Sequence, residues 1–352
     1  MNYTGQFRIK FRATKTSAPG VASLASVFLV SFLLLQPLNG CATQLSGPRA
    51  YVSNERDGTV TVIDTTTDKV ISTIRVGARP RGIRISPDGR RVYVALSFSS
   101  QQTPGTINKI VAIDTSTGEI VGRYDAGNDP EQFAVAHDGK RLYISNEDDG
   151  TASIADIDSG KVIATQIVGI EPEGVTISPD GRWVYITAET SNSVSVIDTK
   201  TNEVVATFLV GARPRDTAFS PDSSFAYVTA ELGRTLSVID TKTHSVVKTV
   251  KLPDGDGVKP MGVVVSSDGA KIYVANGRAN NVSVIDARTY EVLATVAAGQ
   301  RVWGLALTSD GKKLYTANGL SNDVTVIDTA INKAVATIKA GDGPWGVAIK
   351  GS

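Results

Sequence analysis

Residues 50–89 read AYVSNERDGTVTVIDTTTDKVISTIRVGARPRGIRISPDG, and near-copies of this phrase fill most of the 352-residue chain. Its tyrosine, Tyr51, recurs six more times, as Tyr93, Tyr143, Tyr185, Tyr227, Tyr273 and Tyr315. The seven copies are spaced 42, 50, 42, 42, 46 and 42 residues apart. Each copy contains four short runs rich in Val, Ile, Thr and Tyr, separated by Gly, Pro, Asp and Asn. Such runs are typical of β-strands joined by turns, so each copy is predicted to form four strands.

A ring is the architecture that this repeat favours. One small sheet cannot bury both of its faces alone, whereas in a ring each sheet lies between two neighbours. The sequence therefore predicts an all-β fold over residues 50–352, a seven-bladed β-propeller with four antiparallel strands per blade. The repeats begin near Tyr51 with what would be the second strand of a blade, and residues 346–350 resemble an innermost strand. We expect this C-terminal strand to complete the first blade, which removes exposed sheet edges.

The composition excludes several classes of function. The formal charge is +1, so no strongly basic face for nucleic acid is expected. One Cys rules out an internal disulfide framework and a multi-cysteine metal centre, and two His leave little material for an imidazole-rich site. The sequence lacks a C-x-x-C-H haem motif, and no glycine-rich nucleotide loop opens a helix. We expect no cofactor and no bound metal, and we expect a monomer.

The N-terminal segment has the layout of an export signal. Residues 1–20 carry four Lys or Arg and no acidic residue, and residues 21–35 contain no charge, Pro or Gly. This apolar stretch is shorter than the roughly 18 to 20 residues that a spanning helix needs. Residues 38–41, Leu-Asn-Gly-Cys, resemble a bacterial lipobox, in which Cys41 would be lipidated. The prediction is a signal peptide over 1–40, a linker over 41–49 and a periplasmic protein tethered to the membrane through Cys41. Cleavage by an ordinary signal peptidase at Gly40-Cys41-Ala42 is the alternative.

The repeated phrases YVSN, YITAE, YVAN and YTAN, followed by VSVID or VTVID and then VGxxPxG, resemble the YVTN family of β-propeller repeats. Blades such as DPEQFAVAHDGKRLYISNEDDG and GQRVWGLALTSDGKKLYTANG are also similar to the propeller proteins associated with pyrroloquinoline-quinone (PQQ)-dependent alcohol catabolism. That resemblance implies a periplasmic accessory protein without an established catalytic role. It also suggests a quinoprotein dehydrogenase or a cytochrome as the partner.

One face of the predicted ring carries the candidate site. The extra residues of the second and fifth copies, at 97–109 and 252–259, both fall in loops of this face, and such loops commonly carry binding residues. The residue just before each inner strand would form a ring around the channel mouth: Trp345, Arg81, Glu131, Glu173, Arg215, Met261 and Trp303. The residue after each second strand would add another ring: Glu55, Ser97, Glu147, Glu189, Glu231, Gly277 and Gly319. The aromatic residues and glycines gather on one side and the charges on the other, which suits a ligand or protein partner with one apolar part.

Two functions remain open at this stage. The favoured one is a non-catalytic exported propeller that presents this face to a protein or small ligand in a PQQ-dependent alcohol oxidation system. The alternative is a lactonase-like or lyase-like enzyme using the Glu/Arg cluster. Its carboxylates could act as a base or hold calcium, but pairing with Arg81 and Arg215 is the simpler expectation.

Overall fold

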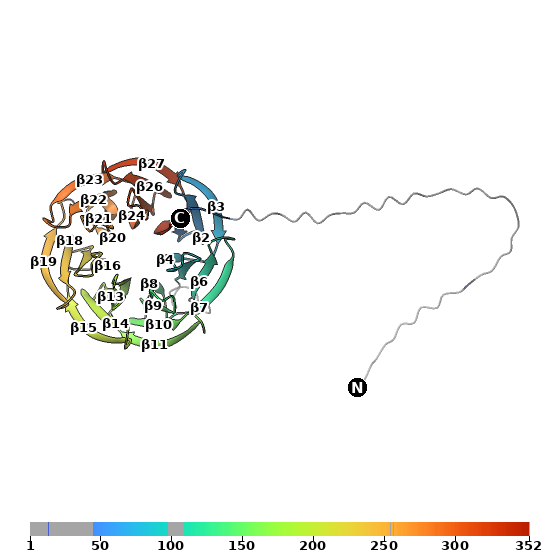
Figure 1. Cartoon of the computed structure of the whole chain (residues 1–352), viewed down its shortest axis with the longest axis horizontal. Coiled ribbons are helices and arrows are strands. Elements are labelled where there is room, and N and C mark those ends of the chain that lie inside the picture. The colour runs from blue at the N-terminus through green and yellow to red at the C-terminus, as the bar shows by residue number, and fades with distance from the viewer. Residues whose placement is uncertain (1–12, 14–44, 98–108, 254, 256, 352) are drawn as a thin grey trace, which may run out of the picture. The chain divides into compact units, whose positions relative to one another are not determined.

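The computed structural model describes residues 13, 45–97, 109–253, 255 and 257–351 (Figure 1). The predicted signal peptide, Cys41, most of the predicted linker and the insertion at 98–108 lie outside the described residues. Within the described part, no helix is long and apolar enough to cross a membrane. The chain from Arg49 onward forms seven four-stranded antiparallel sheets, arranged as the blades of a ring.

The strands of the first four blades are as follows, from the innermost to the outermost. Blade 1 contains β28 (Pro344–Lys350), β1 (Arg49–Asn54), β2 (Thr59–Asp64) and β3 (Lys69–Arg75). Blade 2 contains β4 (Pro80–Ile85), β5 (Arg91–Leu96), β6 (Lys109–Asp114) and β7 (Ile120–Asp125). Blade 3 contains β8 (Pro130–Val135), β9 (Arg141–Asn146), β10 (Thr151–Asp156) and β11 (Lys161–Ile167). Blade 4 contains β12 (Pro172–Ile177), β13 (Trp183–Ala188), β14 (Ser193–Asp198) and β15 (Glu203–Leu209).

The other three blades follow the same order. Blade 5 contains β16 (Pro214–Phe219), β17 (Phe225–Ala230), β18 (Thr235–Asp240) and β19 (Ser245–Lys251). Blade 6 contains β20 (Pro260–Val265), β21 (Lys271–Asn276), β22 (Asn281–Asp286) and β23 (Val292–Ala297), with a 3₁₀ turn, η1 (Gly277–Ala279), between its two middle strands. Blade 7 contains β24 (Val302–Leu307), β25 (Lys313–Asn318), β26 (Asp323–Asp328) and β27 (Lys333–Lys339).

The predicted closure of the ring is confirmed. β28 pairs antiparallel with β1, with Arg49 opposite Lys350 and Tyr51 opposite Ala348, so the C-terminal strand is the innermost strand of blade 1. The two ends of the repeat region are thereby joined by main-chain hydrogen bonds, and neither is left as an open sheet edge.

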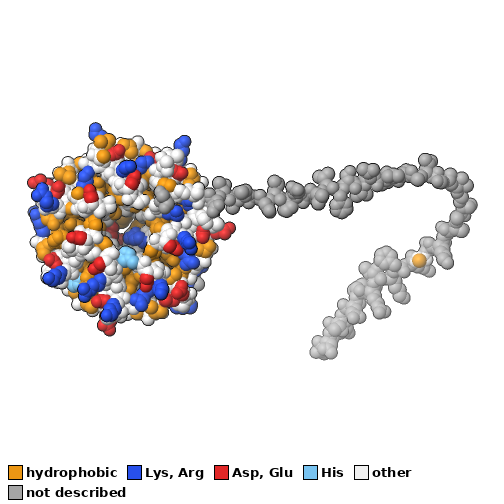
Figure 2. Space-filling model, in the orientation of Figure 1, with side chains coloured by type: hydrophobic (Ala, Val, Ile, Leu, Met, Phe, Trp, Pro, Cys, Tyr) orange, Lys and Arg blue, Asp and Glu red, His pale blue; other side chains and the backbone are white. Residues whose placement is uncertain are grey.

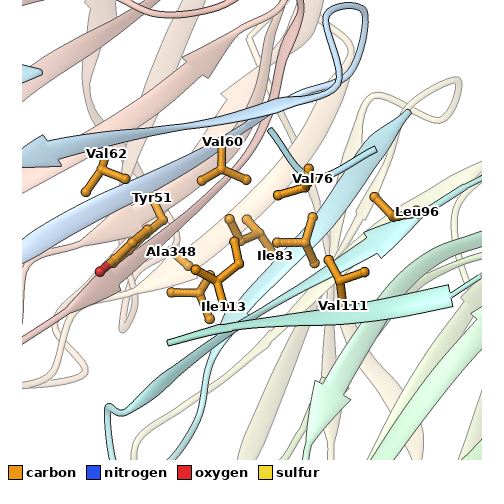
Figure 3. Packing of buried hydrophobic residues seen from close by; sticks show 11 residues of the cluster. Tyr51, Val60, Val62, Val76, Ile83, Leu96, Val111, Ile113 and Ala348 are labelled. Carbon is orange, nitrogen blue, oxygen red and sulfur yellow. The ribbon is translucent and has the colours of Figure 1, made fainter. Parts of the chain in front are cut away.

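The hydrophobic core lies between neighbouring blades. In Figure 3, Tyr51 and Val62 of blade 1 pack with Ile83 and Ile113 of blade 2 in a single buried cluster. The outermost strands show a different pattern, since β11 and β15 alternate between exposed and half-buried residues. The periodic Val and Ile of the repeat therefore fill the spaces between adjacent sheets, which explains why each blade needs its neighbours.

The recurrent asparagine of the repeat has a structural role. The side-chain amide of Asn54 donates hydrogen bonds to Thr59 Oγ1 at 3.0 Å and Thr61 Oγ1 at 2.9 Å on the next strand. Asn146, Asn276 and Asn318 make the equivalent pairs of bonds to residues five and seven positions later. This asparagine satisfies polar groups inside the blade, so four of the seven repeats retain it for packing.

Candidate functional site

Every residue of the predicted ring is the second residue of an innermost strand. This shared place puts the seven residues around the channel, and five of them line a cavity of about 510 Å³ that we call the funnel cavity. The five ring residues that line it are Arg81, Glu173, Arg215, Trp303 and Trp345. Figure 2 shows the face of the ring on which histidine side chains are exposed; this face is hollowed at its centre too, with charged side chains inside the hollow. The second predicted ring contributes Glu55, Glu147, Glu189 and Gly319 to the funnel cavity.

Two ring residues lie elsewhere. Glu131 is fully buried and pairs with Arg81, so it sits behind the cavity wall. Met261 is 5% exposed and lines two small adjoining pockets, one of them shared with Glu231 and Arg278. Neither of these two residues therefore lines the funnel cavity.

The two tryptophans form an aromatic wall. The rings of Trp303 and Trp345 are stacked with centroids 6.1 Å apart and an angle of 23° between their planes. A side chain at position 319 would collide with the indole, because a Cβ there would be 2.8 Å from Trp303 Cδ1. Gly319 therefore leaves the room that the sequence pattern suggested. The guanidinium groups of Arg81 and Arg215 lie 5.8 Å and 5.7 Å from the Trp345 and Trp303 rings, joining the aromatic wall to the charged one.

Arg81 lies at the centre of the first charge cluster. Its Nη2 is 2.9 Å from Glu55 Oε1, and its Nη1 pairs with Glu131. Arg79 adds longer contacts of 3.6 Å to both Glu55 and Asp129. These pairs are half-buried or buried. The guanidinium groups therefore compensate the negative charge of carboxylates, a charged form that burial would otherwise disfavour.

Arg215 lies at the centre of the second cluster. It contacts Glu231 at 2.6 Å and Glu173 at 3.1 Å, and it pairs with Glu189. Burial lowers the pKa of Arg215, but these three carboxylates outweigh that effect and raise its pKa overall. Burial and the Glu131 charge hold the pKa of Glu173 well above its usual range. The expected pairing of Arg81 and Arg215 with glutamates is thus present on both sides of the cavity.

Glu147 is the group best placed for acid–base chemistry. The carboxylate oxygens of Asp129, Glu131 and Glu147 lie within 4.8 Å of one another. Burial, the charge of Glu131 and a hydrogen bond with Glu131 raise the pKa of Glu147 to about 8. Burial alone would raise the pKa of Glu131 too, but the Arg81 charge prevails and lowers it. One carboxyl of the pair is therefore ionised while the other holds a proton near neutral pH.

These three carboxylates also offer the oxygen ligands that calcium prefers. However, Asp129 faces Arg79 and Glu131 pairs with Arg81. Because two of the three charges are already compensated, the cluster is better suited to moving a proton than to holding a cation.

Sequence reasoning missed a third set of residues, two positions before each ring residue. Arg79, Asp129, Glu171, Arg213 and Arg301 occupy this place, and all adopt left-handed backbone conformations with φ between 46° and 59°. Non-glycine residues in this region are uncommon and gather at functional sites. The available sequence signal was a repeated pattern: a charged residue is followed by Pro or Val, and then by a ring residue.

Arg301 differs from the other arginines of the funnel cavity. Its guanidinium stacks on the Trp303 ring at 4.6 Å, and burial lowers its pKa. Within residues 45–97, 109–253, 255 and 257–351, no carboxylate lies within ion-pair distance of it. It therefore offers a positive charge in the cavity that is not already neutralised.

The two histidines lie away from the funnel cavity, whose lining includes neither of them. His137 is exposed and its Nε2 lies 2.9 Å from the Ser178 carbonyl oxygen. His244 is half-buried, with its Nδ1 2.7 Å from the Tyr185 hydroxyl and its ring packed edge-on against Trp183. Both interactions are structural ones.

Solved structures share the fold across most of the chain. A hydrazine synthase of Kuenenia stuttgartiensis has a TM-score of 0.67 and 24% identity, covering 76% of this chain and 89% of the other. A periplasmic gluconolactonase of Pseudomonas aeruginosa has a TM-score of 0.73 and 19% identity, covering 87% of this chain and 99% of the other. A putative 6-phosphogluconolactonase of Bacteroides uniformis has a TM-score of 0.73 and 17% identity, covering 86% of this chain and 100% of the other. No curated protein matches the sequence.

A family model assigns the chain and corrects our expectation of its function. The model described as "Lactonase, 7-bladed beta-propeller" matches residues 41–162, 97–207 and 198–339. The favoured prediction of a non-catalytic accessory protein, and with it the expectation that the chain is no enzyme, is wrong, because this family match supports the enzymatic alternative. Pairing with arginine was the simpler expectation for the glutamates of the cavity, and the repeat pattern does not reveal the raised pKa of Glu147. The chain belongs to the lactonase family of seven-bladed β-propellers.

Proposed function

We propose that the protein hydrolyses a lactone, the cyclic ester of a hydroxy acid, in the funnel cavity, with Glu147 as the general base. The family match supports this class of reaction, and similar structures include a gluconolactonase and a putative 6-phosphogluconolactonase. The observation that carries the proposal is the pKa of about 8 for Glu147 in the funnel cavity, whose lining also includes Arg79 and Arg81. A general base works best when its pKa lies near the working pH.

The proposed step uses one water molecule. Ionised Glu147 takes a proton from water, and the resulting hydroxide attacks the lactone carbonyl carbon. The carbonyl oxygen becomes an oxyanion in a tetrahedral intermediate, which then collapses and breaks the ring C–O bond. The departing alkoxide takes the proton from Glu147, so lactone and water become a hydroxycarboxylic acid. This acid loses its own proton to solvent above a pH of roughly 4.

Guanidinium groups supply the positive charge that the oxyanion needs. Arg79 contacts its carboxylates at 3.6 Å, and its buried Nη1 has no hydrogen-bond partner within the described part of the chain. It therefore remains available as a donor in the cavity that Glu147 also lines. Preorganised donors of this kind stabilise a developing negative charge at little reorganisation cost.

The stacked tryptophans are suited to hold the ring of the substrate. Replacing both, Trp303→Ala with Trp345→Ala, removes the apolar wall of the cavity, so we expect KM for the best lactone to rise at least about tenfold while the protein stays folded. Steady-state kinetics and circular dichroism measure the two properties. Trp183→Ala is the matched control, because Trp183 begins β13 and does not line the funnel cavity. An unchanged KM in the folded double variant would remove the tryptophans from the site.

The proposal is tested by hydrolysis of a lactone panel. Purified protein lacking residues 1–41 should release protons from glucono-1,5-lactone, 6-phosphoglucono-1,5-lactone or an uncharged butyrolactone faster than buffer does. A pH indicator follows the release, and heat-denatured protein provides the background. Rates equal to this background for every lactone at pH 6 to 9 would overturn the proposed function.

The place of action is a separate proposal. The basic residues, apolar stretch and Cys41 of the N-terminal segment support export and attachment to a membrane through a lipid. The YVTN naming of the repeat likewise stays a prediction.

A further inference from the structure

A second cavity of about 510 Å³ lies along the axis of the ring. It is lined mainly by the third to sixth residues of the seven innermost strands and shares no residue with the funnel cavity. A small pocket lined by Glu173, Arg215, Trp303 and Trp345 on one side, and by Gln132 and Asp216 on the other, lies between the two. We call the second space the axial cavity.

The repeat itself shows which residues of the axial cavity are exceptional. The sixth residue of every innermost strand is apolar: Ile85, Val135, Ile177, Phe219, Val265, Leu307 and Ile349. The fifth residue is Ala, Thr or Val in six strands and an arginine, Arg84, in β4. The third is Gly in five strands, where the next blade lies so close that a Cβ at position 262 would be 2.6 Å from the Trp303 carbonyl oxygen. At this third position, the two exceptions are Gln132 in β8 and Asp216 in β16.

Arg84 is thus a lone positive charge next to a ring of apolar side chains, the sixth residues of the innermost strands. One of its five N–H donors is used, by Nη1 with the Ile83 carbonyl oxygen at 3.0 Å. Within the described residues, no carboxylate lies within ion-pair distance of it. Burial lowers the pKa of Arg84, and the more distant charge of Asp216 only partly opposes that effect.

Asp216 does not lie within ion-pair distance of Arg84, and its oxygens accept hydrogen bonds from backbone N–H groups instead. Oδ1 accepts a hydrogen bond from the Thr217 N–H at 2.9 Å, and Oδ2 accepts one from the Val263 N–H at 3.2 Å. Two buried oxygens of the cavity lining, Gln132 Oε1 and Thr217 Oγ1, have no hydrogen-bond partner within the described part of the chain. Unsatisfied polar groups in such a place are costly unless something else pairs with them.

We propose that the axial cavity is a second binding site, for a small monocarboxylate with an apolar body. The carboxylate accepts hydrogen bonds from the Arg84 guanidinium, whose planar fork matches two carboxylate oxygens. The apolar body packs among the seven sixth-position side chains, which makes burial of a hydrocarbon favourable. A single negative charge fits better than two, since Asp216 would repel a dianion.

Titration calorimetry with octanoate tests this site, with 1-octanol as the uncharged match. We expect one octanoate per chain, at least tenfold weaker binding of octanol, and at least tenfold weaker octanoate binding in Arg84→Ala. Four innermost strands carry alanine at the same place, namely Ala134, Ala218, Ala306 and Ala348, so this variant should fold. Arg301→Ala is the matched control: it removes an unpaired guanidinium from the funnel cavity and should leave octanoate binding unchanged.

Three results would overturn the proposal: no octanoate binding to the unaltered protein, equal binding in folded Arg84→Ala, or loss of binding in Arg301→Ala instead. If Arg84→Ala does not fold, Asp216→Asn decides, because removing the negative charge should tighten octanoate binding and unchanged or weaker binding counts against the site. Lactone hydrolysis is measured in the same samples. Arg84→Ala should retain it, so failure of this site and failure of the proposed enzymatic function are told apart.

Discussion

Glu147→Gln should lower kcat for lactone hydrolysis by about 10²- to 10⁴-fold, the range that a positioned general base contributes. The amide has nearly the shape of the carboxyl group but cannot accept a proton from water. Glu147 is neutral at the lower end of the working range, so the substitution should leave KM and the fold nearly unchanged. Steady-state kinetics with the best lactone of the panel measure both constants.

The pH profile gives a second readout of the same group. The pKa of Glu147 is about 8, and only its ionised form is a base, so kcat of the unaltered protein should rise with pH up to about 8 and then level off. Stability should change in the opposite direction. The folded protein holds the proton between the ordinary pKa of 4.5 and about 8, whereas the unfolded chain does not, so the free energy of unfolding contributed by Glu147 falls as pH rises through this window.

Glu119→Gln is the control for both measurements, because Glu119 is exposed in a turn before β7. As pH rises from 6 to 9, the free energy of unfolding of Glu147→Gln should increase relative to that of the unaltered protein. The free energy of unfolding of Glu119→Gln should not. If Glu147→Gln keeps at least half of the activity, or if the rate stays flat across pH 6 to 9, Glu147 is not the base.

Arg215→Met should lower the free energy of unfolding by about 3–5 kcal/mol, the cost of leaving a buried charge without its partner. The reason is that Glu173, Glu189 and Glu231 all contact this one guanidinium. The loss should shrink as pH falls from 8 to 5, since protonation of these carboxyl groups removes the uncompensated charge. Urea denaturation at several pH values measures the effect.

Arg56→Met is the matched comparison. Arg56 contacts Asp342 at 2.7 Å, but both side chains are more than 40% exposed, so its loss should cost less than about 1 kcal/mol. Equal effects of the two substitutions, or a loss in Arg215→Met that does not depend on pH, would mean that the Arg215 cluster does not hold the blades together.

Much of the fold could be predicted because a repeat shows its own pattern seven times. The strands, the blade order and the closure by β28 all followed from the positions of residues such as Tyr51 and the C-terminal strand. The ring of Arg81, Arg215, Trp303 and Trp345 followed as well, since equivalent positions in a closed ring must surround one axis. Glu131 was placed in the same ring but is buried, because its side chain turns to Arg81 behind the wall.

The function could not be predicted from the same pattern. The proposed chemistry depends on contacts between blades, which the repeat pattern does not show. Glu147 follows β9, and the charges that set its pKa come from both blade 2 and blade 3. The left-handed residues Arg79 and Arg301 also needed a backbone conformation that residue spacing does not reveal.

The sequence by itself determined the architecture of this protein, because hydrophobic periodicity and turn residues act locally and are repeated in every blade. It also determined which residues face the axis, since ring closure puts equivalent positions at equal distances from it. Only the tertiary structure decided which of these charges are satisfied. Arg215 shares three carboxylates, whereas Arg301 and Arg84 have none within ion-pair distance in the described residues. Distance and burial set the strength of an electrostatic interaction, and both depend on how neighbouring blades pack.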